Sequence, residues 1–236
     1  MRLGSAPDSP VRLGSAPDSP VRLGSAPDSP VRSGFARQTD IDALPDDLAA
    51  AATTARAFVP RDRTQSVHRR RLLGFAARHP DALHRTCEVG HLTASAWVVN
   101  HDATRGLVLL HRKIGRWLQP GGHADGEGAL ASVALREATE ETGIDGLEVW
   151  TDPIDVDVHL FVNRRRTEPD HLHFDVRFLV RAPQHATPSG NHESEGLRWI
   201  SRRELTDPGL GLDVSTRRLA QYGFDLARTV GPGRDQ

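Results

Sequence analysis

Residues 121–144 read GGHADGEGALASVALREATEETGI, and this stretch determines how the rest of the sequence is interpreted. Glu137, Glu140 and Glu141 are three and four positions apart, so they share one face of an α-helix. Like charges at this spacing destabilise an isolated helix unless a cation neutralises them. Carboxylate oxygens are hard ligands that suit Mg²⁺ or Mn²⁺ rather than zinc. The stretch therefore predicts a helix that carries a metal site, although an exposed acidic face is the simpler explanation of the glutamates alone.

The residues around these glutamates also fit a functional helix. Leu130, Ala134 and Ala138 recur every four positions and form a face that can pack closely on a sheet. Gly143 is placed to end the helix in the left-handed conformation. The two glycines at 121–122 let the backbone approach a ligand without clashes of a Cβ atom. Arg136 is next to Glu137 and could orient it or hold phosphate.

The stretch resembles the Nudix hydrolase signature, G-x5-E-x7-R-E-U-x-E-E-x-G-U, in which U is aliphatic. The matching residues are Gly122, Arg136, Glu137, Ala138, Glu140, Glu141, Gly143 and Ile144. One position departs from the signature, because Gly128 stands where the first glutamate belongs. Glu127 and Asp125 are candidates to replace that glutamate. The order of strand, strand, Pro-Gly-Gly and helix extends the resemblance to about residues 91–205.

The resemblance implies an α/β fold, a Nudix-type α/β/α sandwich with a mixed sheet. It also implies a Mg²⁺-dependent hydrolase, with Mn²⁺ as an alternative ion. Such an enzyme cuts a phosphoanhydride bond in a nucleoside diphosphate linked to another group. The metal ligands that it implies are the carbonyl of Gly122 and the carboxylates of Glu137, Glu140 and Glu141. The alternative is a non-catalytic Nudix module that binds a nucleotide, and the glycine at 128 is a typical first sign of it.

The catalytic residues that follow from the resemblance are Glu137 and Arg136, together with a general base outside the helix. Glu193 and Glu195 lie just before the last predicted strand, and Glu195 is the preferred base. An exposed acidic loop explains these two residues equally well. Arg112 and Lys113 end a predicted strand just before the signature, where they could contact substrate phosphate. A solvated strand end is the alternative.

A set of histidines adds a second candidate site. Asp155, Asp157 and His159 alternate along one predicted strand, and His171, His173 and Asp175 alternate along the next. Alternating residues share one face of a strand, so these side chains could lie near one another, with His123 pointing the same way. We assign His123, His159, His171 and His173 to substrate binding, with a second metal site as another interpretation. A solvated polar face of the sheet explains the pattern as well.

The other elements follow from hydrophobic periodicity and from turn residues. Expected helices cover 41–58, 66–79, 129–143 and 213–228, with Asp213 or Ser215 as the N-cap of the last. Expected strands cover 92–100, 106–112, 156–162, 172–180 and 197–200. The third and fourth of these strands form a hairpin. The arrangement shows neither a Rossmann nor a P-loop motif.

The domain organisation follows from three decapeptide copies that open the chain, MRLGSAPDSP and two of VRLGSAPDSP. They lack helix or strand periodicity, so we expect residues 1–38 to be a disordered tail, either a sequence duplication or a segment for protein contacts. A helical segment at 39–90 is expected to pack on a Nudix domain at 91–228. Residues 229–236 are expected to be a flexible C-terminus.

Composition narrows the function classes. The net charge is −1, which excludes a strongly basic protein that binds a nucleic acid polymer through bulk charge. A single cysteine, Cys87, excludes a disulfide framework, and it lacks the flanking motif of the isomerases built on the Nudix scaffold. No apolar run is long enough for a membrane span or a secretory signal. We expect a cytoplasmic protein that acts on a small nucleotide-type diphosphate, and homodimerisation, common among Nudix proteins, stays open.

Overall fold

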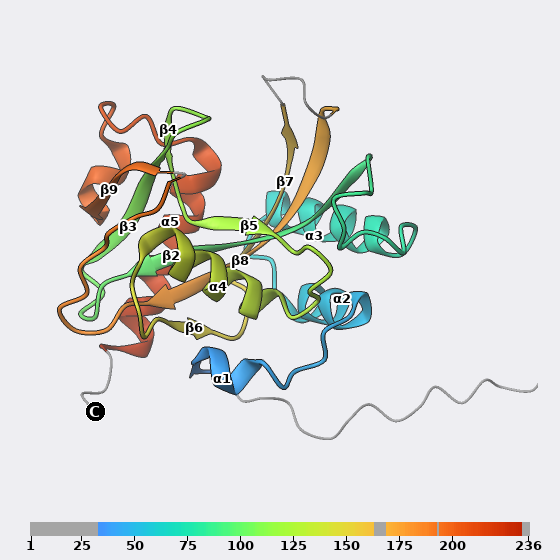
Figure 1. Ribbon diagram of the computed structural model, residues 1–236, viewed down its shortest axis with the longest axis horizontal. Coiled ribbons are helices and arrows are strands. Elements are labelled where there is room, and N and C mark those ends of the chain that lie inside the picture. Colours follow the sequence, from blue (N-terminus) through green and yellow to red (C-terminus); the bar gives the residue numbers. More distant parts are fainter. Residues whose placement is uncertain (1–32, 163–168, 193, 233–236) are drawn as a thin grey trace, which may run out of the picture. The chain divides into compact units, whose positions relative to one another are not determined.

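The computed structural model describes residues 33–162, 169–192 and 194–232 (Figure 1). Its helices are α1 (Gln38–Ile41), α2 (Leu48–Ala57), α3 (Arg63–Ala76), α4 (Leu130–Thr142), a 3-10 helix (Arg202–Thr206) and α5 (Val214–Val230). The strands are β1 (Phe35–Ala36), β2 (Gly90–Val99), β3 (Arg105–His111), β4 (Arg116–Leu118), β5 (Gly121–His123), β6 (Glu148–Trp150), β7 (Asp155–Phe161), β8 (His171–Arg181) and β9 (Ser194–Ser201).

The strands form one mixed sheet around a central pair. β2 and β8 run parallel over ten paired residues, and β5 is antiparallel to β2. β7 and β6 pair with the other side of β8, while β9 and β4 pair with β3. β2 and β8 are buried along most of their length, as expected for parallel strands in the middle of a sheet.

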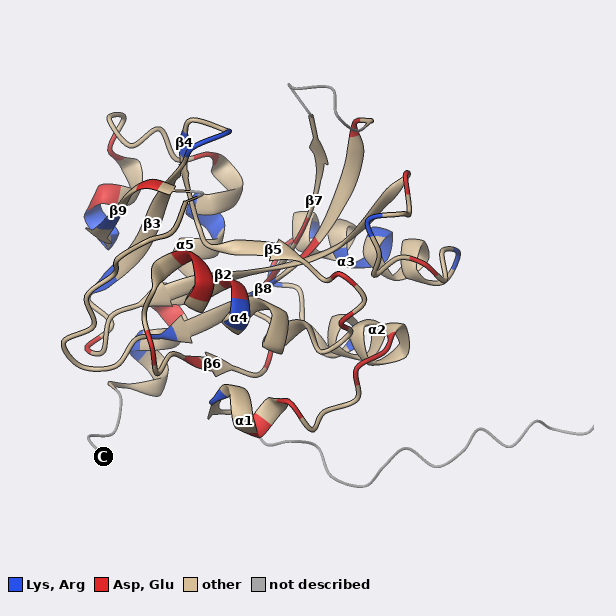
Figure 2. Cartoon of the chain, viewed as in Figure 1, with Lys and Arg blue, Asp and Glu red and all other residues tan. Residues whose placement is uncertain are grey.

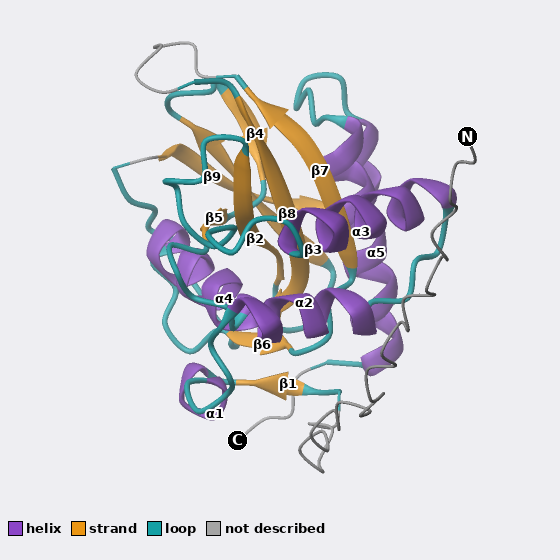
Figure 3. Cartoon of the chain, turned by 90° about the vertical axis from the view of Figure 1, so that its right-hand side faces the viewer, coloured by secondary structure: helices purple, strands orange, loops and turns teal. Residues whose placement is uncertain are grey.

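Helices cover both faces of this sheet. On one face, the even-numbered residues of β2 and β8 pack against α4, α2 and α3, which share one apolar core with them. On the other face, Trp97 and Leu179 pack against Leu219 and Phe224 of α5. Figure 3 shows α2 and α3 side by side, with β1 at one edge of the sheet. The predicted α/β class, with helices on both faces of a mixed sheet, is confirmed.

Several expected element boundaries are wrong. The helix expected at 41–58 is two helices, because α1 ends at Ile41 and α2 begins after its N-cap Asp47, which accepts a hydrogen bond from the Ala50 amide. Pro45 lies in the loop between them. Sequence periodicity also missed β1, β4, β5 and β6, each of which has only two or three residues and too few positions for a pattern.

The expected tail at 1–38 extends too far. Phe35 and Ala36 pair with Trp150 and Val149 of β6, and Gln38 begins α1, so residues from 33 onward belong to the folded part. Residues 1–32 lie outside the described residues. At the other end, α5 continues to Val230, two residues into the expected flexible C-terminus, and residues 233–236 lie outside the described residues.

Other expectations agree with the structure more closely, although α3 lies three residues before the expected 66–79 and β9 begins three residues before the expected 197. The hairpin of β7 and β8 forms with His159 opposite His173 and Asp157 opposite Asp175. Gly143 ends α4 in the left-handed conformation, with φ 63° and ψ 24°. The N-cap of α5 is Asp213, which accepts a hydrogen bond from the Thr216 amide. Among the described residues, no helix is long and apolar enough to cross a membrane.

Candidate active site

The centre of the site is the close approach of α4 to β5. A Cβ atom built on Gly122 would lie 2.3 Å from the Glu137 carboxyl carbon, so only glycine leaves room for this carboxylate. The Gly122 backbone therefore lies directly beside the Glu137 carboxylate. Glu137 keeps only 17% of its side chain exposed.

The other two glutamates have different surroundings. Glu141 is buried, and its Oε2 accepts a hydrogen bond of 2.9 Å from the Gly121 amide, which ties α4 to the start of β5. Glu140 is the most exposed of the three, with 59% of its side chain accessible. Figure 2 shows acidic and basic residues next to each other on α4.

Arg136 links the acidic groups around the helix. Its guanidinium donates to Glu137 Oε1 at 2.8 Å and lies 3.9 Å from Glu140 Oε1. Its Nε also lies 3.6 Å from Glu127 Oε2. Burial raises the pKa of Glu137, and the Arg136 guanidinium opposes that rise. An arginine held between carboxylates in this way fixes the orientation of Glu137.

Gly128, the departure from the signature, has a local structural cause. A Cβ at this position would lie 1.9 Å from the Asp47 carbonyl oxygen and 2.7 Å from the Asp47 nitrogen. The Asp46 carboxylate accepts hydrogen bonds from the amides of Gly128 and Ala129, at the start of α4. The segment before α2 thus occupies the space that a side chain at 128 would need.

The two candidates to replace the missing glutamate are placed differently. Glu127 faces Arg136, as described above, so it contributes a negative charge beside the site. Asp125 instead accepts two hydrogen bonds of 2.7 Å from the Arg85 guanidinium. This bidentate pair holds Asp125 on the loop before α4, and it lowers the pKa of the Asp125 carboxyl. Glu127 is therefore the better placed of the two.

The residues expected to complete the site lie on other elements. Glu195 is exposed on β9, and Glu193 lies outside the described residues. Arg112 and Lys113 are exposed in the turn between β3 and β4. The contacts of Glu137 come from α4 and β5, so a role for these residues in binding or proton transfer stays a prediction.

The predicted histidines come together on the opposite face of β5. Gly122 and His123 are consecutive in β5, so their side chains point to opposite faces of the sheet. His123 lies with His171 and His173 of β8, and Nε2 of His171 is 3.1 Å from Nε2 of His173. Sequence analysis missed the fourth member, His91, because the expected strand began one residue later. We call His91, His123, His171 and His173 the imidazole cluster.

Two rings of the imidazole cluster have lowered pKa values, which favours their neutral form. Burial, together with the neighbouring imidazoles, lowers the pKa of His173 to about 2. Burial, with the Arg85 guanidinium and His91, lowers the pKa of His123 to about 4. His159 lies at the margin, with its ring 5.4 Å from that of His173 and its Nδ1 3.0 Å from Asp157.

The interpretation of this face as a solvated surface is wrong. Its three carboxylates, those of Asp155, Asp157 and Asp175, form a buried ion network with two arginines, Arg177 and Arg218. The fully buried Arg177 donates to Asp175 at 2.7 Å and reaches both other carboxylates at 3.3 Å. Sequence analysis missed both arginines. Arg177 continues the alternation of His171, His173 and Asp175, so the same pattern could have found it, whereas Arg218 is on α5, 63 positions after Asp155.

A comparison with known protein families identifies the family of the chain. Residues 90–219 match the NUDIX domain, which is more than half of the chain. The chain belongs to this family. The match begins at the first residue of β2 and ends within α5, so it contains both the carboxylates of α4 and the imidazole cluster.

Individual relatives of this Nudix chain are distant. It is 29% identical over 139 residues to "Putative 8-oxo-dGTP diphosphatase 3" from two strains of Mycobacterium tuberculosis, CDC 1551 / Oshkosh and ATCC 25618 / H37Rv. The alignment covers 54% of this chain and 60% of those proteins.

Solved structures also match this chain, at low sequence identity. The E. coli dihydroneopterin triphosphate pyrophosphohydrolase has a TM-score of 0.48 and 18% identity, covering 58% of this chain and 96% of that chain. A NUDIX-family hydrolase from Clostridium perfringens has a TM-score of 0.42 and 20% identity, covering 58% of this chain and 97% of that chain.

The residues of this Nudix chain fit a hard divalent cation at α4. The donors are carboxylate oxygens and a backbone carbonyl, which Mg²⁺ and Mn²⁺ prefer over nitrogen or sulfur. The Glu137 carboxylate lies where a side chain at Gly122 would begin, so the glycine brings the backbone and the carboxylate close together. Glu140 stays exposed, so its carboxylate is open to solvent.

Proposed function

We propose that this Nudix chain is a Mg²⁺-dependent hydrolase, with Mn²⁺ as an alternative ion, that cleaves a phosphoanhydride bond in a nucleoside diphosphate linked to another group. The observation that carries the proposal is the approach of Glu137 to the Gly122 backbone, with Glu140 and Glu141 on the same helix. A nucleoside triphosphate is one such compound, since its third phosphate is the linked group. The name of the mycobacterial relatives supports testing oxidised and ordinary nucleoside triphosphates first.

The site residues have separable tasks. Gly122, Glu137, Glu140 and Glu141 would hold the ion, which when bound neutralises the polyphosphate and activates water. Arg136 orients Glu137 and keeps it from turning away from β5. Glu141 fixes the distance between α4 and β5 through its hydrogen bond with the Gly121 amide. Glu195 is the proposed general base, and Arg112 and Lys113 are proposed to bind the outer phosphates.

The binding-module alternative rests on Gly128. The packing of Asp47 against this glycine supports a different explanation, in which the family glutamate is absent because backbone fills its place. Glu137, Glu140, Glu141 and Arg136 are all present, which favours catalysis. A cytoplasmic location and a homodimer stay predictions.

The test is a substrate panel. Ordinary and 8-oxo nucleoside triphosphates, dinucleoside polyphosphates and nucleotide sugars are incubated with Mg²⁺, with Mn²⁺ or with chelator, and the products are separated by chromatography. We expect metal-dependent cleavage by the unaltered chain and its loss in Glu137→Gln, by at least about 100-fold. The matched control is Glu88→Gln, which changes an exposed glutamate before β2.

Two outcomes would contradict the proposal. Cleavage that persists in chelator, or that is unchanged in Glu137→Gln, would remove the carboxylates of α4 from the mechanism. An absence of cleavage across the panel, combined with a nucleotide that raises the melting temperature, would favour the binding module.

A further inference from the structure

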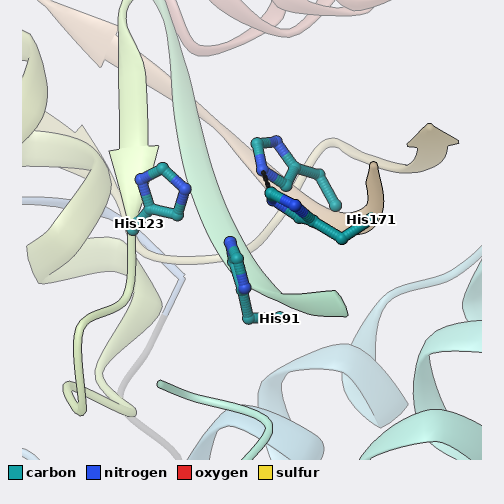
Figure 4. Close-up of side chains that lie close together, drawn as sticks. His91, His123 and His171 are labelled. Carbon is teal, nitrogen blue, oxygen red and sulfur yellow. Dashed lines mark hydrogen bonds between the residues drawn. The ribbon is translucent and has the colours of Figure 1, made fainter. Parts of the chain in front are cut away.

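The imidazole cluster brings together four rings from three strands that are far apart in sequence. His91 is on β2, His123 is on β5, and His171 and His173 are on β8. The parallel register places His91 directly beside His173, and the antiparallel register places His123 beside Thr93. Figure 4 shows His91 between His123 and His171, with the rings directed toward a common region.

The ring nitrogens are close enough to share one ion. One nitrogen from each of the four rings lies within 4.8 Å of the others. In a tetrahedral site with metal–nitrogen distances of about 2.0–2.1 Å, neighbouring nitrogens are about 3.3 Å apart. The 3.1 Å between His171 Nε2 and His173 Nε2 already approaches this value, and the other nitrogens, all within 4.8 Å, would have to move closer as the ion binds.

A hydrogen bond behind the cluster prepares one ring to bind. Nδ1 of His171 lies 2.9 Å from the Pro169 carbonyl oxygen. A carbonyl only accepts, so Nδ1 carries the proton and Nε2 presents its lone pair toward His173. Metal-bound histidines characteristically donate their second nitrogen to such a carbonyl, which fixes the tautomer and the ring orientation.

The burial of the cluster also favours a metal over a phosphate. His91 and His171 are 2% and 5% exposed, and the other two rings are half-buried. Protonating several buried rings within about 5 Å of each other would place like charges in a poorly solvated region. Neutral imidazoles offer lone pairs, which bind transition metals well and attract a phosphate only weakly.

We propose that His91, His123, His171 and His173 form a tetrahedral site for a transition metal of the zinc class, separate from the carboxylate site of α4. Four protein ligands close the coordination sphere, so the ion has a structural task. It joins β2, β5 and β8, and it fixes β5 at the residue next to Gly122. The proposal is independent of the substrate that the carboxylate site cleaves.

A second group of side chains competes for the same ions. His79, Asp81 and Cys87 also place one donor atom each within 4.8 Å, and Cys87 Sγ lies 3.8 Å from His79 Nδ1. This group has only three donors, and burial raises the pKa of the Cys87 thiol, which disfavours the thiolate that binds metals. Sulfur makes it distinguishable from the imidazole cluster by spectroscopy.

The experiment titrates the metal-free full-length chain with Co²⁺ and with Zn²⁺. We expect one tightly bound equivalent, a visible Co²⁺ spectrum typical of tetrahedral nitrogen ligands, and a higher melting temperature with Zn²⁺. His123→Gln and His173→Gln, on separate strands, should each weaken binding by at least about 100-fold, because losing even an outer partner of a ligand costs about 10- to 100-fold. The controls His185→Asn, an exposed loop histidine, and Glu140→Gln should keep the signal.

X-ray absorption of the zinc-loaded unaltered chain needs no variant and therefore decides the matter even if a substitution prevents folding. We expect four nitrogens at about 2.0–2.1 Å, with the pattern of imidazole rings. A sulfur shell at about 2.3 Å that disappears in Cys87→Ser would assign the ion to the competing group and overturn the proposal. An absence of tight binding would overturn it as well.

Discussion

At the residue scale, Gly128 shows how one position can depart from a signature without removing the site. Its place in the signature belongs to a glutamate, yet the Asp47 backbone lies where any side chain would begin. The Asp46 carboxylate instead accepts hydrogen bonds from the amides of Gly128 and Ala129. A carboxylate at the start of a helix is favourable, because it satisfies amides that have no partner within the helix. The segment before α2 therefore stabilises α4.

Restoring the family glutamate should harm this chain. Gly128→Glu forces the Asp46–Asp47 segment away, so we expect the free energy of unfolding to fall by about 1–3 kcal/mol, as in other overpacked sites. We also expect no gain in turnover. Denaturant unfolding and steady-state rates check both results. Gly196→Ala is the matched control, since its new Cβ would meet only Trp117 at an ordinary 3.7 Å. A more active Gly128→Glu of normal stability would show that Gly128 is a defect.

At the element scale, the hairpin of β7 and β8 is held to α5 by the buried ion network. Arg177 of β8 contacts carboxylates from both strands of the hairpin, and Arg218 of α5 contacts Asp155 and Asp157 of β7. Gln65 of α3 donates to Asp155 at 2.8 Å, so a further helix joins the same network. Buried charges are tolerated only when they are paired and hydrogen-bonded, as they are here.

Acid should therefore weaken this junction. Burial alone would raise the pKa of Asp157, but the nearby guanidiniums and His159 lower it well below its usual value. The stabilisation from a lowered carboxyl pKa is complete above the unfolded value of about 3.8 and is lost as the pH falls toward the folded value. Asp157→Asn should lose at least about 2 kcal/mol of unfolding free energy at pH 7 and show a shallower fall in stability below pH 3.8.

Denaturant unfolding between pH 2 and pH 7 checks this prediction, with Asp145→Asn, an exposed turn residue after α4, as the control. Equal acid sensitivity of Asp157→Asn and the unaltered chain would mean that the ion network does not carry the pH dependence.

At the scale of the whole molecule, the folded part reaches further toward the N-terminus than the family match. Ile41 is buried in the same core as α4 and β2, and Gln38 donates to Ser132 of α4 at 2.6 Å. The segment before β2 is therefore part of the structure that supports α4. We expect removal of residues 1–32 to leave the melting temperature and turnover unchanged.

Removal of residues 1–47 tests the other side of this prediction. It takes away Ile41 and the Asp46 carboxylate, so both the melting temperature and turnover should fall, and Asp46→Ala should reproduce part of the loss, about 0.5–2 kcal/mol. Asp145→Ala is the control. If the shortened chain were as stable as the full-length chain, the segment before α2 would not contribute to the stability of the fold.

The sequence predicts some parts of this structure well and others poorly, for physical reasons. The glutamates of α4 and the left-handed Gly143 depend on local spacing, which a helix fixes within one or two turns. The hairpin depends on the alternation of polar and apolar residues along each strand, which can be read directly from the sequence. Gly128 contacts Asp46, 82 positions away, and Arg218 contacts Asp155, 63 positions away, and no local pattern encodes those contacts. The same limit hid His91, whose role depends on the register of β2 with β8.

The measurement that tests the central claim most directly is the initial rate of cleavage as a function of Mg²⁺ concentration, for the unaltered chain and for Glu140→Gln. Glu140 is the most exposed glutamate of the site, so its substitution removes one proposed ligand of the ion with little effect on the fold. We predict no turnover without the ion, saturation with it, and a shift of the Glu140→Gln curve to higher Mg²⁺. Turnover without a divalent ion, or two superimposable curves, would contradict the claim that the carboxylates of α4 hold the catalytic metal.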